Sequence, residues 1–99
     1  MRKYYSDFVS HCARLYFNTD AIPSPLTDKV KYNNYIAVSN VLDGYSTEDA
    51  MFLRQVYTSE GNLPKNVERM AINRGCKSET LWYVIQTFER DVAVERGLL

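Results

Sequence analysis

Apolar residues recur at helical spacing in several short segments of this chain, and this periodicity restricts the fold more than any other feature. The clearest case follows Ser78, where the apolar residues at i, i+3, i+4, i+7 and i+11 are Leu81, Val84, Ile85, Phe88 and Val92. This spacing puts them along one side of an α-helix. Residues 35–38 have strand propensity, but one isolated short strand would leave its backbone groups without partners. The pattern therefore predicts an all-α fold.

Prolines, glycines and capping residues divide the pattern into five helices. Pro23 and Pro25 end the first helical segment, because proline lacks the amide donor that a helix interior needs. Thr27, Ser46 and Ser78 are predicted N-caps, since their hydroxyls can accept from backbone amides of the first turn. The five predicted helices span Lys3–Phe17, Thr27–Asp43, Ser46–Tyr57, Pro64–Arg74 and Ser78–Arg96.

The length of the chain sets its domain organisation. A chain of 99 residues is short for two independent cores, so we expect one compact domain. Within it, residues 1–45 form a two-helix extension packed on residues 46–99. The residues predicted to be buried in the first two helices are Tyr4, Tyr5, Phe8, Val9, Cys12, Leu15, Tyr16, Val30, Ala37, Val38, Val41 and Leu42.

Charge and cysteine content narrow the function classes. Lys and Arg number 12 and Asp and Glu number 12, so any contact with nucleic acid must come from a local basic patch. Cys12 and Cys76 lie far apart without metal-binding spacing, which favours reduced thiols and a cytoplasmic location. The sequence contains no apolar run of the length of an export leader or a membrane span, so no membrane contact is expected.

Signals for catalysis are weak. His11 stands beside Cys12, but neighbouring helical residues point about 100° apart and cannot share a proton. Glu48 and Asp49 stand where a helix begins, and the helix macrodipole accounts for two carboxylates there. Neither a cluster of metal ligands nor a phosphate-binding glycine loop is visible in the sequence. We therefore expect no enzymatic activity, no metal and no cofactor.

The segment from Val67 to Ile85 has the spacing of a helix-turn-helix. Two helices that cross through a three- or four-residue turn need a small residue where their backbones approach, and Ala71 is in that position. Gly75, four residues later, suits the left-handed conformation of the corner, and Ser78 follows as the cap of the second helix. The inward apolar residues of this second helix are Leu81 and Val84.

Residues 46–98 resemble region 4 of the sigma-70 class of bacterial transcription factors, and the small region-4-like regulators encoded by phages and integrative elements. The resemblance rests on Ser46-Thr47-Glu48-Asp49, Phe52-Leu53, Tyr57, Val67-Glu68, Ala71, Gly75, Ser78-Glu79, Leu81, Val84 and Glu89. In that family the helix after the turn enters the major groove, and the glutamate that reads the groove matches Glu79. The resemblance implies a promoter-binding or regulatory role in a phage-type or mobile-element setting.

The chain also departs from that family. Arg74 stands where the family usually has a buried aliphatic residue, and Cys76 stands where it has valine. The helix after the turn has few cations, with Thr80, Trp82 and Tyr83 at positions where the family often has Arg or Gln. Residues 1–45 have no counterpart in region 4, and no region-2 sequence is present. The resemblance is therefore to a small regulator and not to a complete sigma factor.

The last predicted helix offers side chains that can read DNA. Glu79, Tyr83 and Gln86 project away from its apolar side, where glutamate can accept from cytosine and glutamine can pair with adenine. The candidate phosphate contacts are Lys65, Arg69, Arg74, Lys77 and Arg90. A solvated helix face explains these charges equally well, and core or dimer packing is the favoured interpretation for Trp82.

The sequence thus predicts a DNA-binding transcriptional regulator whose partner is double-stranded DNA. The alternative is a non-enzymatic protein-interaction module that keeps the helix-turn-helix but contacts RNA polymerase or a second copy of itself. Zero net charge and the cation-poor helix favour this alternative. The local cations between residues 64 and 77 favour DNA.

Overall fold

The computed structural model describes residues 3–99. Within that range the regular secondary structure is entirely α-helical. The helices are α1 (Ser6–Phe17), α2 (Lys29–Leu42), α3 (Thr47–Thr58), α4 (Leu63–Arg74) and α5 (Ser78–Glu95). They form one globule of 45 × 28 × 24 Å, whose radius of gyration of 13.4 Å is that of a compact chain of this length. The prediction of an all-α, five-helix fold is confirmed. Residues 1 and 2 of the predicted extension lie outside the described residues.

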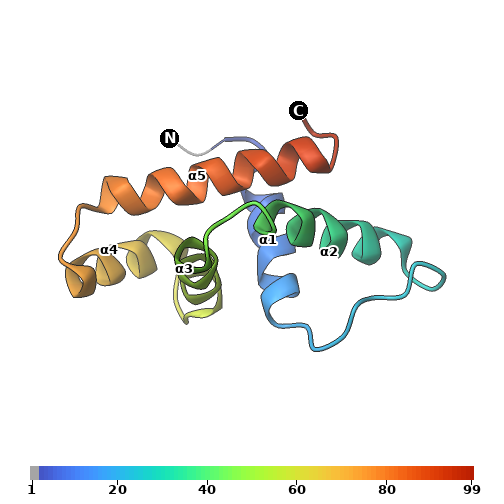
Figure 1. The fold of residues 1–99 in the computed structure, drawn as a ribbon, viewed down its shortest axis with the longest axis horizontal. Helices are drawn as coiled ribbons and strands as arrows, with labels where there is room; N and C mark the ends of the chain where they lie inside the picture. Colours follow the sequence, from blue (N-terminus) through green and yellow to red (C-terminus); the bar gives the residue numbers. More distant parts are fainter. Residues whose placement is uncertain (1–2) are drawn as a thin grey trace.

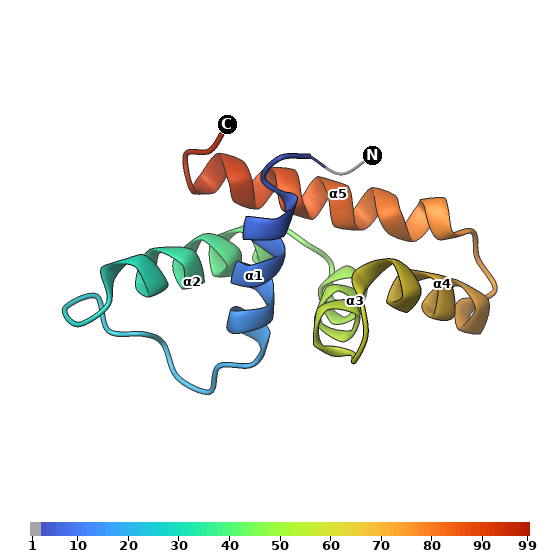
Figure 2. The same ribbon diagram turned by 180° about the vertical axis from the view of Figure 1, so that it is seen from behind.

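The longest helix, α5, organises the other four (Figure 1). It runs along one side of the molecule and packs against α4 near its start and against α1 and α2 further along. α3 packs against both α1 and α4. The view from behind shows the same order, with the connection between α1 and α2 looping away from α5 (Figure 2).

Side chains cap three of the helices as the physical chemistry of helix ends requires. Ser46 accepts from the amide of Asp49 at 3.1 Å, which confirms it as the predicted N-cap of α3. Asn62 caps α4 by accepting from the amide of Lys65, and Pro64 lies in the first turn, where its missing donor is harmless. These caps fix where α3 and α4 begin.

The core lies where the apolar sides of the five helices meet. Its largest fully buried side chains are Tyr57 and Phe52 of α3 and Phe88 of α5. Tyr57 also places its hydroxyl against a buried carboxylate, because its Oη donates to Oε2 of Glu89 at 2.9 Å. Ser10 of α1 donates to the same oxygen at 3.1 Å. Glu89, only 2% exposed, therefore ties α1, α3 and α5 together.

Four of the residues that the sequence predicted to be buried are exposed. The first helix begins at Ser6, so Tyr4 precedes it and is 80% exposed, with its hydroxyl donating to the carbonyl of Leu98. α1 contacts α2, α3 and α5 through Val9, Cys12 and Ala13, which leaves Phe8 and Leu15 partly exposed on either side. Val30, in the first turn of α2, is 62% exposed.

Two predicted caps are also wrong. Asp28, and not Thr27, caps α2, because its carboxylate accepts from the amide of Lys31 at 3.0 Å. Ser78 is the first residue of α5, and the N-cap position falls on Lys77 without a side-chain hydrogen bond. The hydroxyl that could cap α5 is thus one residue too late in the chain.

Candidate nucleic-acid interface

The turn between α4 and α5 is built on a left-handed glycine. α4 ends at Arg74, and Gly75 has φ 65° and ψ 34°. The amide of Cys76 then donates to the carbonyl of Ala71 at 3.1 Å, and the amide of Gly75 to that of Ile72. These bonds satisfy carbonyls that the end of a helix leaves open. After this turn α5 runs back over α4 (Figure 1).

Apolar contacts and a buried amide hold α4 in place under α5. Ala71 of α4 and Leu81 of α5 are both buried, as the sequence predicted. Asn66, 1% exposed, donates through Nδ2 to the carbonyls of Val56 and Ser59 at the end of α3. Arg69 donates to Oδ1 of the same amide at 2.9 Å. The sequence reasoning missed Asn66, because an asparagine in a helix gives no sign of which distant carbonyls it meets.

The candidate base-reading residues share one exposed side of α5. Glu79, Tyr83 and Gln86 are all exposed, and Tyr83 retains 72% of its accessible surface. Their spacing of four and three residues places them within one strip of the helix. Glu79 lies in the first turn of α5, next to the Gly75 corner. The arrangement offers a carboxylate, a phenol and an amide in a row to a molecule that approaches from solvent.

Lys3 and Tyr5 lie beside the far end of this strip. Lys3 and Tyr5 line a hollow of about 210 Å³ together with Tyr83, Gln86 and Arg90. Arg90 is therefore next to Lys3, not next to the cations of α4. Sequence reasoning missed this neighbourhood, because more than eighty positions separate Lys3 from Gln86 and no local pattern records such a contact.

The candidate phosphate contacts do not form a single cluster. Lys65 and Arg69 lie one turn apart on α4, and both are exposed. Arg74 is nine residues from Lys65, which turns it about half a revolution around the helix axis. Its guanidinium lies 5.2 Å from the ring centre of Phe52 in α3. Lys77 is the N-cap residue of α5.

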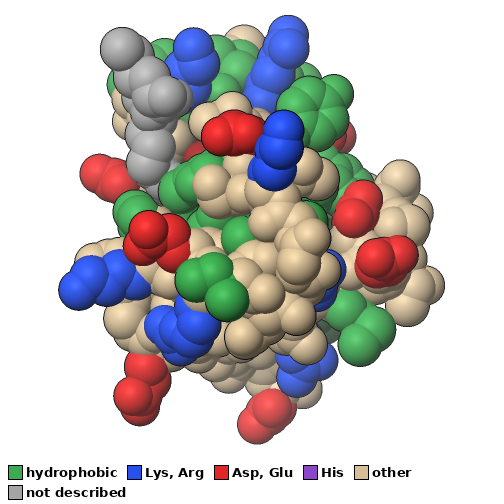
Figure 3. All heavy atoms as spheres, turned by 90° about the vertical axis from the view of Figure 1, so that its left-hand side faces the viewer, with side chains coloured by type: hydrophobic (Ala, Val, Ile, Leu, Met, Phe, Trp, Pro, Cys, Tyr) green, Lys and Arg blue, Asp and Glu red, His purple; other side chains and the backbone are tan. Residues whose placement is uncertain are grey.

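Acidic side chains lie among these cations. An open groove of about 470 Å³ at the turn is lined by Glu48 and Asp49 as well as by Arg74 and Cys76. The end of the molecule that carries the turn shows Lys and Arg side chains interspersed with Asp and Glu (Figure 3). The local field at this end is therefore mixed in sign.

Trp82 and the cysteines have simpler roles. Trp82 is partly buried and packs against the core, in agreement with the packing interpretation favoured from sequence. Cys76 is exposed at the turn and Cys12 is buried in α1, and neither forms a disulfide. Burial raises the pKa of the Cys12 thiol.

Between residues 3 and 99, His, Cys, Asp and Glu side chains form no group of three or more that could hold a metal ion. Over the same range, no helix combines the length and the apolar character that a membrane span requires.

Comparison with known proteins gave no family for this chain: it matches no protein-family model, no curated protein and no solved structure.

Proposed function

We propose that this protein binds double-stranded DNA through α4, the Gly75 turn and α5, as a transcriptional regulator with a helix-turn-helix. The observation that carries the proposal is the left-handed Gly75 between two helices whose facing residues, Ala71 and Leu81, are buried. This turn brings the exposed start of α5 to an end of the molecule. A helix docked in the major groove contacts base edges with its N-terminal residues.

The exposed strip of α5 supplies side chains for base recognition. Gln86 has an amide that can pair with adenine, and the carboxylate of Glu79 can accept from the amino group of cytosine. Tyr83 can bond a phosphate or pack on a thymine methyl group. All three side chains are exposed, so a DNA duplex reaches them without rearrangement of the core.

The distribution of cations limits the strength of non-specific binding. Lys65, at the start of α4, and Lys77, at the turn, are both exposed, and Lys3 lines a hollow with Arg90 at the other end of the strip. Each phosphate contact contributes through counterion release, so a few separated cations give weak binding that depends on salt. Sequence recognition must then supply most of the discrimination.

The test is the affinity for a random-sequence DNA duplex, measured by fluorescence anisotropy at two salt concentrations. Binding should weaken as salt rises, and the Lys65→Gln/Lys77→Gln double variant should lower the salt slope by about one unit per contact. Lys29→Gln, on exposed α2 surface far from the turn, is the matched control and should keep the wild-type slope. An unchanged slope in the double variant, or no binding at low salt, would contradict the proposal.

A second candidate function is a protein-interaction module, and one surface favours it. Tyr4, Val94 and Leu99 are strongly exposed around a hollow that also contains Lys3 and Arg90. Exposed apolar side chains gathered around a hollow mark interaction surfaces. Sedimentation of the pure protein separates the two: a dimer that Val94→Glu dissociates, combined with no DNA binding, would support the interaction module.

A further inference from the structure

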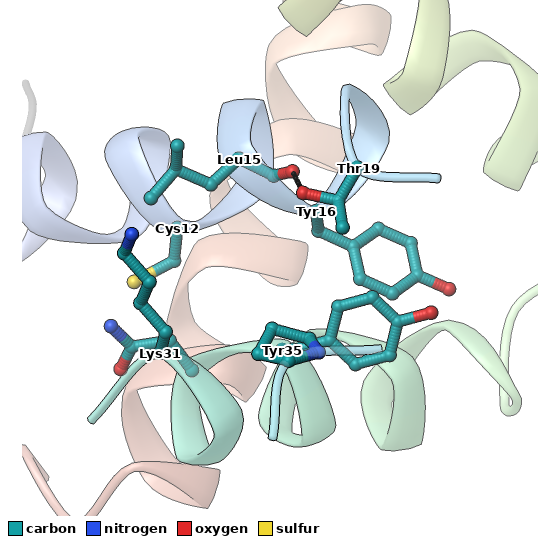
Figure 4. A pocket seen from close by; sticks show the side chains of 8 residues that line it. Cys12, Leu15, Tyr16, Thr19, Lys31 and Tyr35 are labelled. Carbon is teal, nitrogen blue, oxygen red and sulfur yellow. Dashed lines mark hydrogen bonds between the residues drawn. The ribbon is translucent and has the colours of Figure 1, made fainter. Parts of the chain in front are cut away.

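A small hollow opens between α1 and α2, away from the α4–α5 turn (Figure 4). Its volume is about 90 Å³, and its walls come from α1, α2 and the connection between them. Leu15 and Pro23 supply apolar surface. At one side lie the rings of Tyr16 and Tyr35, whose centres are 4.7 Å apart. These walls suit a compact apolar group.

The buried polar group of this hollow is the amide of Asn34, which is 8% exposed. Its Oδ1 accepts from Nε of Arg96 at 2.7 Å. Because the guanidinium can only donate, this bond fixes which end of the amide is oxygen. The other end, Nδ2, makes no hydrogen bond with any residue from 3 to 99. A buried amide donor without an acceptor is costly, so an acceptor from a ligand would be favourable here.

Lys31 supplies a second donor, at the mouth of the hollow. Lys31 extends from α2 toward Cys12 and Leu15 of α1, which places its ammonium at the mouth (Figure 4). Its Nζ is 4.0 Å from Oδ2 of Asp28, a half-exposed neighbour that does not line the hollow. The Thr19 hydroxyl donates to the carbonyl of Leu15. Burial keeps the Cys12 thiol protonated by raising its pKa, and no acidic side chain lines the walls.

We propose that this hollow binds a small monocarboxylate, whose carboxylate accepts from Asn34 Nδ2 and Lys31 Nζ while its tail contacts Leu15 and the tyrosine rings. An apolar cavity of about 150 Å³ holds benzene, so this smaller hollow accepts a tail of roughly three to five carbons. The site is independent of the proposed DNA interface, because it shares none of that interface's residues.

Titration with isovalerate, followed by amide NMR shifts at constant ionic strength and neutral pH, tests the proposal. Saturable shifts are expected at Cys12, Leu15 and Tyr35. Asn34→Asp keeps an oxygen acceptor for Arg96 but replaces the amide donor with a carboxylate, so it should weaken isovalerate binding by about tenfold or more. Lys31→Gln should weaken it by roughly two- to fivefold, because this side chain is 64% exposed.

Two controls separate anion recognition from simple filling of an apolar hollow. Lys29→Gln removes a cation from the same helix outside the hollow and should leave the affinity unchanged. Isovaleramide has the same shape without the charge and should bind more weakly than isovalerate to the wild type. Absence of saturable shifts would overturn the proposal, and so would equal affinity of folded Asn34→Asp or of isovaleramide.

Discussion

The two halves of α5 are held in the fold by different kinds of contact. The second half is tied to three other helices by side-chain hydrogen bonds, through Glu89 to α1 and α3, and through Arg96, the residue that follows the helix, to α2. The first half packs on α4 through small and apolar residues, with Leu81 and Ala71 buried together near a glycine turn. One helix therefore serves as an anchor at one end and as a presented surface at the other.

If α5 binds DNA as proposed, this difference separates stability from recognition along a single helix. Buried hydrogen bonds in the second half make substitutions there costly, since removing one partner leaves the other unpaired. Substitutions in the outward strip of the first half carry no such stability cost, so its side chains are available for the proposed recognition.

Glu89→Ala should lower the free energy of unfolding by about 3–4 kcal/mol, the largest effect of the set. The change leaves the Tyr57 and Ser10 hydroxyls without their common acceptor and opens a cavity among α1, α3 and α5. Urea denaturation followed by circular dichroism measures it. Glu95→Ala, exposed on the same helix, should stay within about 0.5 kcal/mol of wild type. Similar losses in both variants would mean that Glu89 does not anchor α5.

Gly75→Val should cost about 2 kcal/mol, because a β-branched residue is strained at a φ of 65°. A Cβ at this position would meet no atom within 4 Å, so the loss comes from backbone conformation and not from a clash. Gly44→Ala is the matched control, since Gly44 has no positive φ and a Cβ there has only an ordinary contact of 3.6 Å. An unchanged melting temperature in Gly75→Val would remove the basis for the turn.

The sequence predicted the elements better than the contacts between them. Helical periodicity placed all five helices, and Ser46 and Gly75 marked ends that the structure has. The prediction of which α1 residues are buried was wrong in part. A helix with three neighbours buries a different side from the one that its own apolar residues suggest. The predicted N-cap of α2 was wrong because Thr27 and Asp28 are both good capping residues, and the local sequence pattern does not choose between them.

Tyr45→Phe should cost about 1 kcal/mol at pH 7, because the Tyr45 hydroxyl donates to Asp91 of α5 at 2.9 Å. Burial and this hydrogen bond raise the pKa of Tyr45 above its ordinary value of 10.0. The stability that the hydroxyl contributes is therefore complete below pH 10 and is lost as the pH rises above it, when the unfolded chain ionises first. Urea denaturation at pH 7 and about 10.5 should show the gap between wild type and variant closing. A gap that widens at the higher pH would contradict this.

The candidate interface was only partly predictable from sequence. Helical spacing correctly placed Glu79, Tyr83 and Gln86 on one exposed side of α5. It did not reveal that Lys3 lies beside Gln86, or that Arg74 turns toward Phe52 while Lys65 and Arg69 stay together. Such relations depend on how helices dock, and sequence periodicity describes each helix by itself.

The most direct test of the proposed division of α5 compares DNA affinity with stability in Glu79→Ala and Gln86→Ala. A preferred site would first be selected from random duplexes, and affinity for it and for random DNA would be measured along with the urea midpoint. The account predicts a loss of about 1–3 kcal/mol on the preferred site, little change on random DNA, and a free energy of unfolding within about 0.5 kcal/mol of wild type. Unchanged DNA affinity in both variants, with loss of self-association when Tyr83 is replaced by Ala, would show that this strip binds protein instead.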